Sequence, residues 1–245
     1  VSHKLDSLVR RVKIKSIQNF KQKLSIVSPS NWLAKEAELS QVFRGRSICV
    51  IPYAINLDVF STSDKAKLRE KYGIPKNEKV LIALADHTQN FRKGFDLLKD
   101  TINKLPEYKL LLVGGKEKDT RDKDNIRYLG RIENDKILSE YYSLADATVI
   151  PSREDNLPNV MLESFACGTP VISFTVGGLA EHVKNFETGL IAEEMNAESL
   201  RNTIQLFFDN KERFDSVKIR KYAEKHFNEK LIAEKYMEVY SEVLG

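Results

Sequence analysis

The sequence predicts an α/β fold built on a doubly wound parallel sheet. Short aliphatic and β-branched runs alternate with amphipathic helical segments along most of the 245 residues. The runs are apolar at nearly every position, as expected of strands that helices cover on both faces. With 42% hydrophobic and 30% charged residues, the chain can bury a large core without disulfides or metals.

Helix-capping and turn residues predict where the helices and strands of the N-terminal half begin and end. Ser30 can cap a helix, and Gly73 followed by Pro75 can end the next one. Gly114 and Gly115 close a buried strand. In order, the expected elements are a strand at 25–28, a helix at 30–40, a strand at 47–51, a helix at 64–72, a strand at 79–85, a helix at 94–105 and a strand at 108–113.

The C-terminal half continues the alternation and finishes in helices. Pro158 suits the first turn of a helix, where its missing N–H costs nothing. The expected strands are 125–129, 147–150 and 171–174, and the expected helices are 132–145, 158–167, 197–209, 211–226 and 228–243. Ligands of such sheets bind beyond the carboxyl ends of the strands. We therefore expect ligand-binding residues in the loops that follow strands, at 86–94, 114–124, 130–133, 151–159 and 175–179.

The net charge of +4 is concentrated at the N-terminus. Residues 1–23 contain seven basic residues and one acidic residue, whereas the remaining chain contains 32 basic and 34 acidic residues. We interpret this segment as a helix separated from the rest of its domain, with solvated charges. The alternative is contact with an anionic membrane surface or an anionic substrate. Nucleic acid is disfavoured as a partner because stacking aromatic residues are not interleaved with the basic ones.

Cysteine usage and hydropathy favour a reduced, cytoplasmic setting. Cys49 and Cys167 each lie beside an apolar run without metal-ligand spacing, so we expect two small core residues. No apolar run approaches the roughly 20 residues that a membrane span requires, and no signal peptide is visible. Because Val1 is not an initiator methionine, we expect a piece of a longer protein.

The segment 149–183 carries the strongest functional pattern. Asp155 precedes a helix, and Glu163 lies about one and a half turns inside it, so both can face the crevice at the strand ends. A carboxylate can accept two hydrogen bonds from vicinal sugar hydroxyls, and helix N-terminal amides suit hydroxyl or phosphate oxygens. The alternative is a surface loop followed by an acid that the helix dipole favours.

This segment resembles the donor site of glycosyltransferase family four, the retaining GT-B enzymes also called glycosyl transferases group 1. The family has two glutamates with seven residues between them, then an Ala-Cys-Gly-Thr-Pro-Val run and a Gly-Gly-x-x-Glu turn. This chain has Asp155 at the first acid and Glu163 at the second. The resemblance implies that Asp155, or else Glu154, holds a hexose and that Glu163 holds the ribose of a nucleotide. Amides between the two acids would contact the sugar, at Leu157, Pro158 and Asn159.

A second resemblance lies at residues 91–98, which follow a predicted strand and open a helix. The family places a Lys-Gly pair here, which implies that Lys93 meets the donor pyrophosphate. An ammonium group is a suitable partner for a diphosphate leaving group. The alternative is an exposed lysine at a helix start, although a cation there is unfavourable unless an anion compensates it.

One phosphate-binding arginine of the family is absent. Members carry a Gly-Arg pair after the strand, where this chain has Ala85, Asp86 and His87. Arg92 could supply the missing charge, or it could face solvent. His87 is a further candidate for a place near the phosphates.

Residues 128–147 resemble the family's strand and loop beside the nucleobase. The resemblance implies that backbone groups at Gly130 and Arg131 read the base edge. We expect packing and capping roles for the remaining polar residues of this stretch, Tyr141, Tyr142 and Asp146.

The resemblance implies a Rossmann-like domain that is only the latter part of a GT-B enzyme. Residues 50–60 resemble the family's interdomain hinge, with departures at Tyr53, Ala54 and Asn56. The expected organisation is a remnant of the N-terminal acceptor domain with the hinge at 1–57, a donor-binding domain at 58–227, and a C-terminal helix at 228–245 that could pack back on the N-terminal domain.

The function that the resemblance implies is transfer of a sugar, with retention, from a UDP- or GDP-linked donor. Bacterial members with the same Asp-Asn-Leu-Pro-Asn variant suggest surface polysaccharide synthesis, with a sugar or lipid-linked acceptor bound by the missing domain and contact at the inner face of the plasma membrane. Lys93 and Asp155 would be the catalytic residues.

No cofactor, metal cluster, P-loop or Ser-His-Asp set is expected. The alternatives are a non-catalytic nucleotide-sugar-binding module and a sugar-nucleotide epimerase. Without the acceptor site, this chain should bind donor weakly and transfer nothing.

Overall fold

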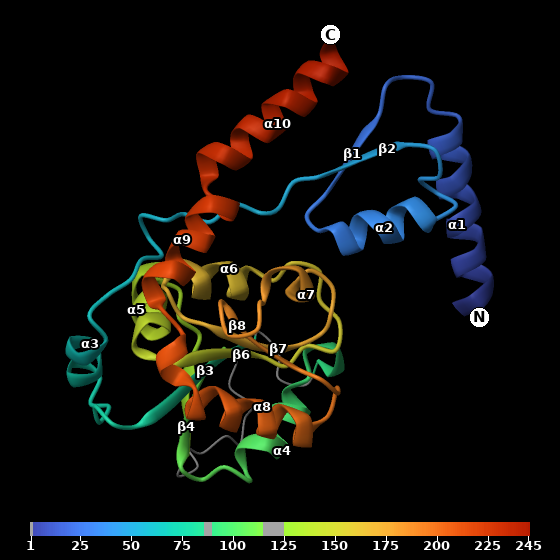
Figure 1. The fold of residues 1–245 in the computed structure, drawn as a ribbon. Coiled ribbons are helices and arrows are strands. Elements are labelled where there is room, and N and C mark those ends of the chain that lie inside the picture. Colours follow the sequence, from blue (N-terminus) through green and yellow to red (C-terminus); the bar gives the residue numbers. More distant parts are fainter. Residues whose placement is uncertain (1, 86–89, 115–124) are drawn as a thin grey trace.

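The computed structural model describes residues 2–85, 90–114 and 125–245, and its main feature is a six-stranded parallel sheet (Figure 1). The strand order is β5-β4-β3-β6-β7-β8. Unbroken apolar runs form the inner strands, as expected where helices cover both faces. The strands are β3 (Lys79–Ala85), β4 (Tyr108–Gly114), β5 (Ile126–Gly130), β6 (Ala147–Ile150), β7 (Val171–Phe174) and β8 (Gly189–Ala192).

Helices pack on both faces of this sheet (Figure 1). One face carries α4 (Phe95–Ile102) and α8 (Ala197–Asp209), which contact each other. The other carries α5 (Asp135–Leu144), α6 (Asn159–Ala166) and α9 (Ser216–Phe227), with α3 (Lys65–Lys71) against α5. Aliphatic strand residues and aromatic helix residues fill the space between the layers; Leu81, Ile82, Phe165 and Phe207 are among those fully buried.

The strand order reverses between β3 and β6. From β3 the chain moves outward through β4 and β5, then returns to the other side of β3 and continues outward through β6, β7 and β8. The connections after β3 and β6 therefore run in opposite directions and leave a crevice beyond the carboxyl ends of these two strands. The loops that follow β3 and β6 carry Lys93 and Asp155.

The N-terminal segment forms a small unit beside the main sheet (Figure 1). It contains α1 (Ser2–Gln18), α2 (Asn31–Leu39) and a two-stranded parallel sheet of β1 (Ser25–Ser28) and β2 (Ser47–Val50). The connection that leaves β2 is held by Arg220, whose guanidinium donates to the carbonyls of Leu57 and Phe60 at 2.9 and 2.5 Å. At the other end of the chain, α10 (Glu229–Leu244) extends away from the sheet.

Several elements differ from the sequence expectation. The edge strand β8 was not expected, and α7 (Leu179–His182) is a single turn after Gly178. The helix expected at 211–226 is broken into η2 (Lys211–Arg213) and α9, because Asp215 accepts hydrogen bonds from Val217 and Lys218 and starts a new helix. Among the described residues, none of the helices combines the length and the hydropathy that a membrane span requires.

The buried carboxylate of Asp146, just before β6, contacts the start of β3, at the end of these strands opposite the crevice. Asp146 accepts a 2.8 Å hydrogen bond from the amide of Val80 and lies 3.0 Å from the guanidinium of Arg69. The ammonium groups of Lys65 and Lys211 lie 3.3 and 2.6 Å from the same carboxylate. The expected packing role of Asp146 is thus an electrostatic one: it compensates the buried Arg69.

We predict that Asp146→Ala lowers the free energy of unfolding by about 3–5 kcal/mol, because it leaves the Arg69 charge buried and uncompensated. Urea denaturation measures this change. The matched control is Asp64→Ala, which removes the exposed cap of α3 and should cost about 1 kcal/mol. Equal losses in the two variants would contradict this role of Asp146.

Candidate functional site

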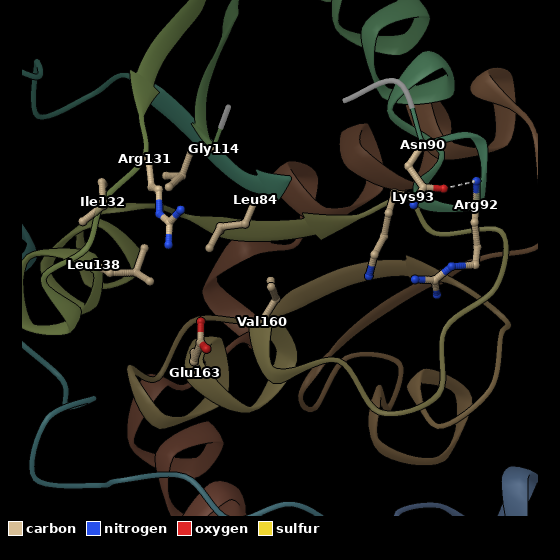
Figure 2. Close-up of a pocket in the computed structure, with 11 residues that line it drawn as sticks. Leu84, Asn90, Arg92, Lys93, Gly114, Arg131, Ile132, Leu138, Val160 and Glu163 are labelled. Atoms are coloured by element: carbon tan, nitrogen blue, oxygen red, sulfur yellow. Dashed lines mark hydrogen bonds between the residues drawn. The ribbon is translucent and has the colours of Figure 1, made fainter. Parts of the chain in front are cut away.

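A cavity of about 460 Å³ opens at the reversal point of the sheet. Its walls come from the ends of β3 and β4, the turn η1 (Phe91–Lys93), the residues after β5, and the helices α5 and α6 (Figure 2). Figure 2 shows Lys93 and Arg92 at one end and Arg131 with apolar side chains at the other, with the carboxylate of Glu163 on the Arg131 side. The lining residues that bear on its chemistry are Arg92, Lys93, Arg131, Ile132, Leu138, Val160 and Glu163.

Gly94 allows the turn that carries Lys93 to press against the end of β6. Its φ is +66°, and a Cβ atom on it would lie 1.8 Å from the carbonyl oxygen of Pro151. Only glycine tolerates both the left-handed backbone and this close approach. Asn90 begins the turn by accepting a 3.1 Å hydrogen bond from the amide of Arg92. The Lys-Gly pair is therefore a structural unit that brings the lysine to the next strand's loop.

Lys93 and Asp155 form an ion pair across the crevice. The ammonium lies 2.7 Å from Asp155 Oδ2, which also accepts a 3.1 Å hydrogen bond from Ser152. Arg92 lies 3.7 Å from the other carboxylate oxygen, so it turns toward the site. Only 9% of Asp155 is exposed. The structure thus brings together Lys93 and Asp155, which the sequence assigned to the phosphate and the sugar, and Arg92, for which the sequence left a solvent-facing position open.

Arg153 ties the two loops together. Its amide donates to the carbonyl of Arg92 at 2.8 Å, and its guanidinium donates to the carbonyl of Phe91 at 2.8 Å. The guanidinium also stacks 3.9 Å from the Phe91 ring and pairs with Asp96 at the start of α4. Sequence reasoning missed Arg153, because an arginine in a polar loop carries no signal of partners some sixty residues away.

Glu163 projects from α6 into the cavity and is held by a buried tyrosine. The hydroxyl of Tyr142 donates to Glu163 Oε2 at 2.7 Å. Burial raises the pKa of the Glu163 carboxyl, the hydrogen bond from Tyr142 partly counteracts this rise, and the charge of Asp135 adds to it. The packing role expected for Tyr142 is incomplete, since its hydroxyl also orients this acid.

The other predicted site residues have different positions. Glu154 is exposed, and of the two candidate acids only Asp155 is buried at the site. Gly130 has a φ of +67° at the end of β5, and the largely exposed Arg131 lines the far end of the cavity.

The start of α6 differs from the expected row of amides. Leu157 is buried, Pro158 is the N-cap of α6, and Asn159 is exposed as its first residue. Pro158 has no N–H, so it cannot be one of the expected donors, which leaves Leu157 and Asn159. Asp86 and His87 lie outside the described residues.

The arrangement suits a ligand with an anionic part and a polyhydroxylated part. Lys93 and Arg92 offer positive charge at the end nearest β6. Asp155, which pairs with Lys93, and Glu163, in the cavity wall, offer carboxylate acceptors. Apolar walls at the opposite end, from Ile132 and Leu138, suit a planar heterocycle.

Comparison with known proteins agrees with this geometry. Residues 64–226 match the family model described as glycosyl transferases group 1. Over 171 residues the chain is 30% identical to D-inositol 3-phosphate glycosyltransferase of Mycobacteroides abscessus, an alignment that covers 64% of this chain and 38% of that protein. The chain therefore spans well under half the length of this relative.

Solved structures with the same fold include GT-B glycosyltransferases. Sucrose-phosphate synthase from Thermosynechococcus elongatus aligns with a TM-score of 0.82 and 27% identity, covering 96% of this chain and 61% of that one. Anabaena HepE in complex with UDP-glucose aligns with a TM-score of 0.75 over 95% of this chain and 67% of that one; at 19% identity this likeness shows the fold alone. On the family match, which covers most of the chain and all of the cavity's strands, this protein belongs to the glycosyl transferases group 1 family.

Proposed function

We propose that this chain is the donor-binding part of a retaining glycosyltransferase that uses a nucleoside-diphosphate sugar. The observation that carries the proposal is the Lys93–Asp155 pair at the reversal point of a parallel sheet, with Glu163 in the wall of the cavity that Lys93 also lines. This arrangement provides a cation for a diphosphate and acids for the hydroxyls of two sugars, one on each side of it.

Each charged residue has a role in the proposed chemistry. Lys93, with Arg92, stabilises the negative charge that accumulates on the departing diphosphate. Asp155 accepts hydrogen bonds from hydroxyls of the donor sugar, and Glu163 accepts them from the ribose. Lys93 lies 2.7 Å from Asp155, so its ammonium can contact the diphosphate next to a sugar that Asp155 holds.

Retention follows from attack on the face that the leaving group occupies. The bond between the anomeric carbon and the diphosphate oxygen breaks, and a bond to the acceptor oxygen forms on the same face. The acceptor proton passes to the departing diphosphate, so a side-chain base is not required. The acceptor site lies in a part of the whole protein other than this chain, which alone should transfer nothing.

The proposed setting is bacterial surface polysaccharide synthesis at the inner face of the plasma membrane. The exposed Leu5, Leu8 and Val12 on the basic helix α1 support contact with an anionic membrane surface. For the donor, we propose a UDP- or GDP-linked sugar. HepE, which shares the fold, was solved with UDP-glucose, and this makes uridine the first base to test.

We predict that the chain binds one of UDP, GDP and ADP, and that Lys93→Ala and Glu163→Ala each weaken this binding at least about tenfold. The reason is the loss of a charge-assisted contact to the ligand. Titration calorimetry measures the affinities, with Lys218→Ala on the exposed side of α9 as the matched control. Undiminished affinity in both site variants would contradict the assignment of the donor site.

We predict that Tyr142→Phe shifts the acidic limb of nucleotide binding to higher pH. The hydroxyl stabilises the charged form of Glu163, so its removal raises the pKa of this carboxyl, and affinity is lost earlier as the pH falls. Calorimetry between pH 4 and 8 measures the midpoint.

Two comparisons separate this effect from others. Glu163→Gln lacks the titrating carboxyl and shows the titration of the ligand alone. Tyr141→Phe alters the neighbouring tyrosine, which packs on Tyr72, and should leave the midpoint unchanged. An unshifted midpoint in Tyr142→Phe would show that the hydroxyl does not act through Glu163.

A further inference from the structure

The N-terminus of α2 touches the loop that holds Asp155. Ser30, which is 1% exposed, donates a 2.5 Å hydrogen bond to the side-chain carbonyl of Asn156. The same Ser30 oxygen accepts from the amide of Leu33 and so caps α2. These residues are 126 positions apart, and Ser30 belongs to the N-terminal unit rather than to the six-stranded sheet.

A second contact docks the same helix end. Glu181, on α7, accepts hydrogen bonds from the amides of Asn31 and Trp32 at 3.1 and 2.7 Å and from the Asn31 side chain at 2.8 Å. A carboxylate at a helix N-terminus is favoured both by the free amides and by the helix dipole. The two contacts together hold α2 against the loop after β6 and against α7, which begins at the glycine turn that follows β7.

That turn also supports the backbone at Asp155. Gly177 has a φ of +47°, and a Cβ atom on it would lie 1.7 Å from the carbonyl oxygen of Asp155. The amide of Gly178 donates to the carbonyl of Asn156 at 2.5 Å, and a Cβ atom on Gly178 would lie 3.2 Å from that of Ser30. The Asp155–Asn156 backbone is thus enclosed between the glycine turn and the cap of α2.

We propose that the N-terminus of α2 positions the Asp155–Asn156 loop for the sugar part of the donor, so that docking of the N-terminal unit and sugar recognition are coupled. This inference rests on the donor site proposed above. Ser30 and Glu181 act here as positioning residues, since neither touches the cavity that would hold the nucleotide.

The coupling is selective for one part of the donor. Ser30 reaches Asp155 through Asn156, whose amide lies 3.2 Å from Asp155 Oδ1. The diphosphate and nucleoside end is built from η1, α6 and the residues after β5, whereas the hydrogen bonds of the α2 N-terminus go to Asn156 and Glu181. Loss of the α2 contact should therefore weaken sugar binding while the affinity for the nucleoside diphosphate is kept.

The test compares two ligands in each of several variants of the 245-residue chain. Calorimetry measures the dissociation constants of UDP and UDP-glucose, GDP and GDP-mannose, and ADP and ADP-glucose. We expect Ser30→Ala and Asn156→Ala each to weaken sugar-nucleotide binding about five- to tenfold relative to the matching diphosphate, the size of one hydrogen bond. The double variant should be no worse than either single one, because both remove the same contact.

Controls separate positioning from a general loss of stability. Asn196→Ala removes the equivalent cap of α8, away from the site, and should leave the ratio of the two affinities unchanged. Glu181→Gln weakens the second contact that docks α2, the one to Asn31 and Trp32. This variant serves as the test if the Ser30 variant fails to fold.

The outcomes are distinct. An unchanged ratio in the Ser30, Asn156 and Glu181 variants, or an equal loss for both ligands, would overturn the coupling and leave the proposed function standing. If the wild-type chain binds none of the six ligands, the proposed function itself is overturned, and this inference with it.

Discussion

The contact between Lys93 and Asp155 depends on the point where the strand order reverses. The two residues come from loops after β3 and β6, adjacent parallel strands whose connections leave in opposite directions. A lysine at the start of a helix is unfavourable without a negative partner, and Asp155 provides one. Gly94, Arg153 and the glycine turn then hold the two loops at this separation. These features of the sequence near the site therefore serve to maintain one ion pair.

The sequence predicts the sheet because its inner strands are continuous apolar runs with no polar alternation. The edge strand β8 was not predicted by this criterion, because Gly189–Ala192 is short and begins with a glycine that packs against the Val171 carbonyl. The break before α9 had a visible signal in Asp215, a strong helix cap, but the helical pattern on either side concealed it. The remaining helix boundaries moved only by a few residues.

The acids and cations of the candidate site could be predicted from the family resemblance, whereas the residues that orient them could not. Asp155, Glu163 and Lys93 lie in segments that resemble a known donor site. Arg153 and Tyr142 act through partners that are distant in sequence, so only the folded chain brings them together. The same is true of Ser30, which sequence reasoning identified as a helix cap and which also reaches Asn156. For Pro158 the sequence alone was sufficient. Proline has no backbone N–H, so it cannot be the amide donor that its position suggested.

The central claim is that the cavity binds a nucleoside diphosphate in one orientation. A crystal structure of this chain with the tightest-binding of UDP, GDP and ADP tests it most directly. The account predicts diphosphate oxygens within hydrogen-bonding distance of Lys93 Nζ, ribose hydroxyls at the Glu163 carboxylate and the base beside Ile132. A nucleotide bound elsewhere, or bound in reverse with its diphosphate at Arg131, would contradict it.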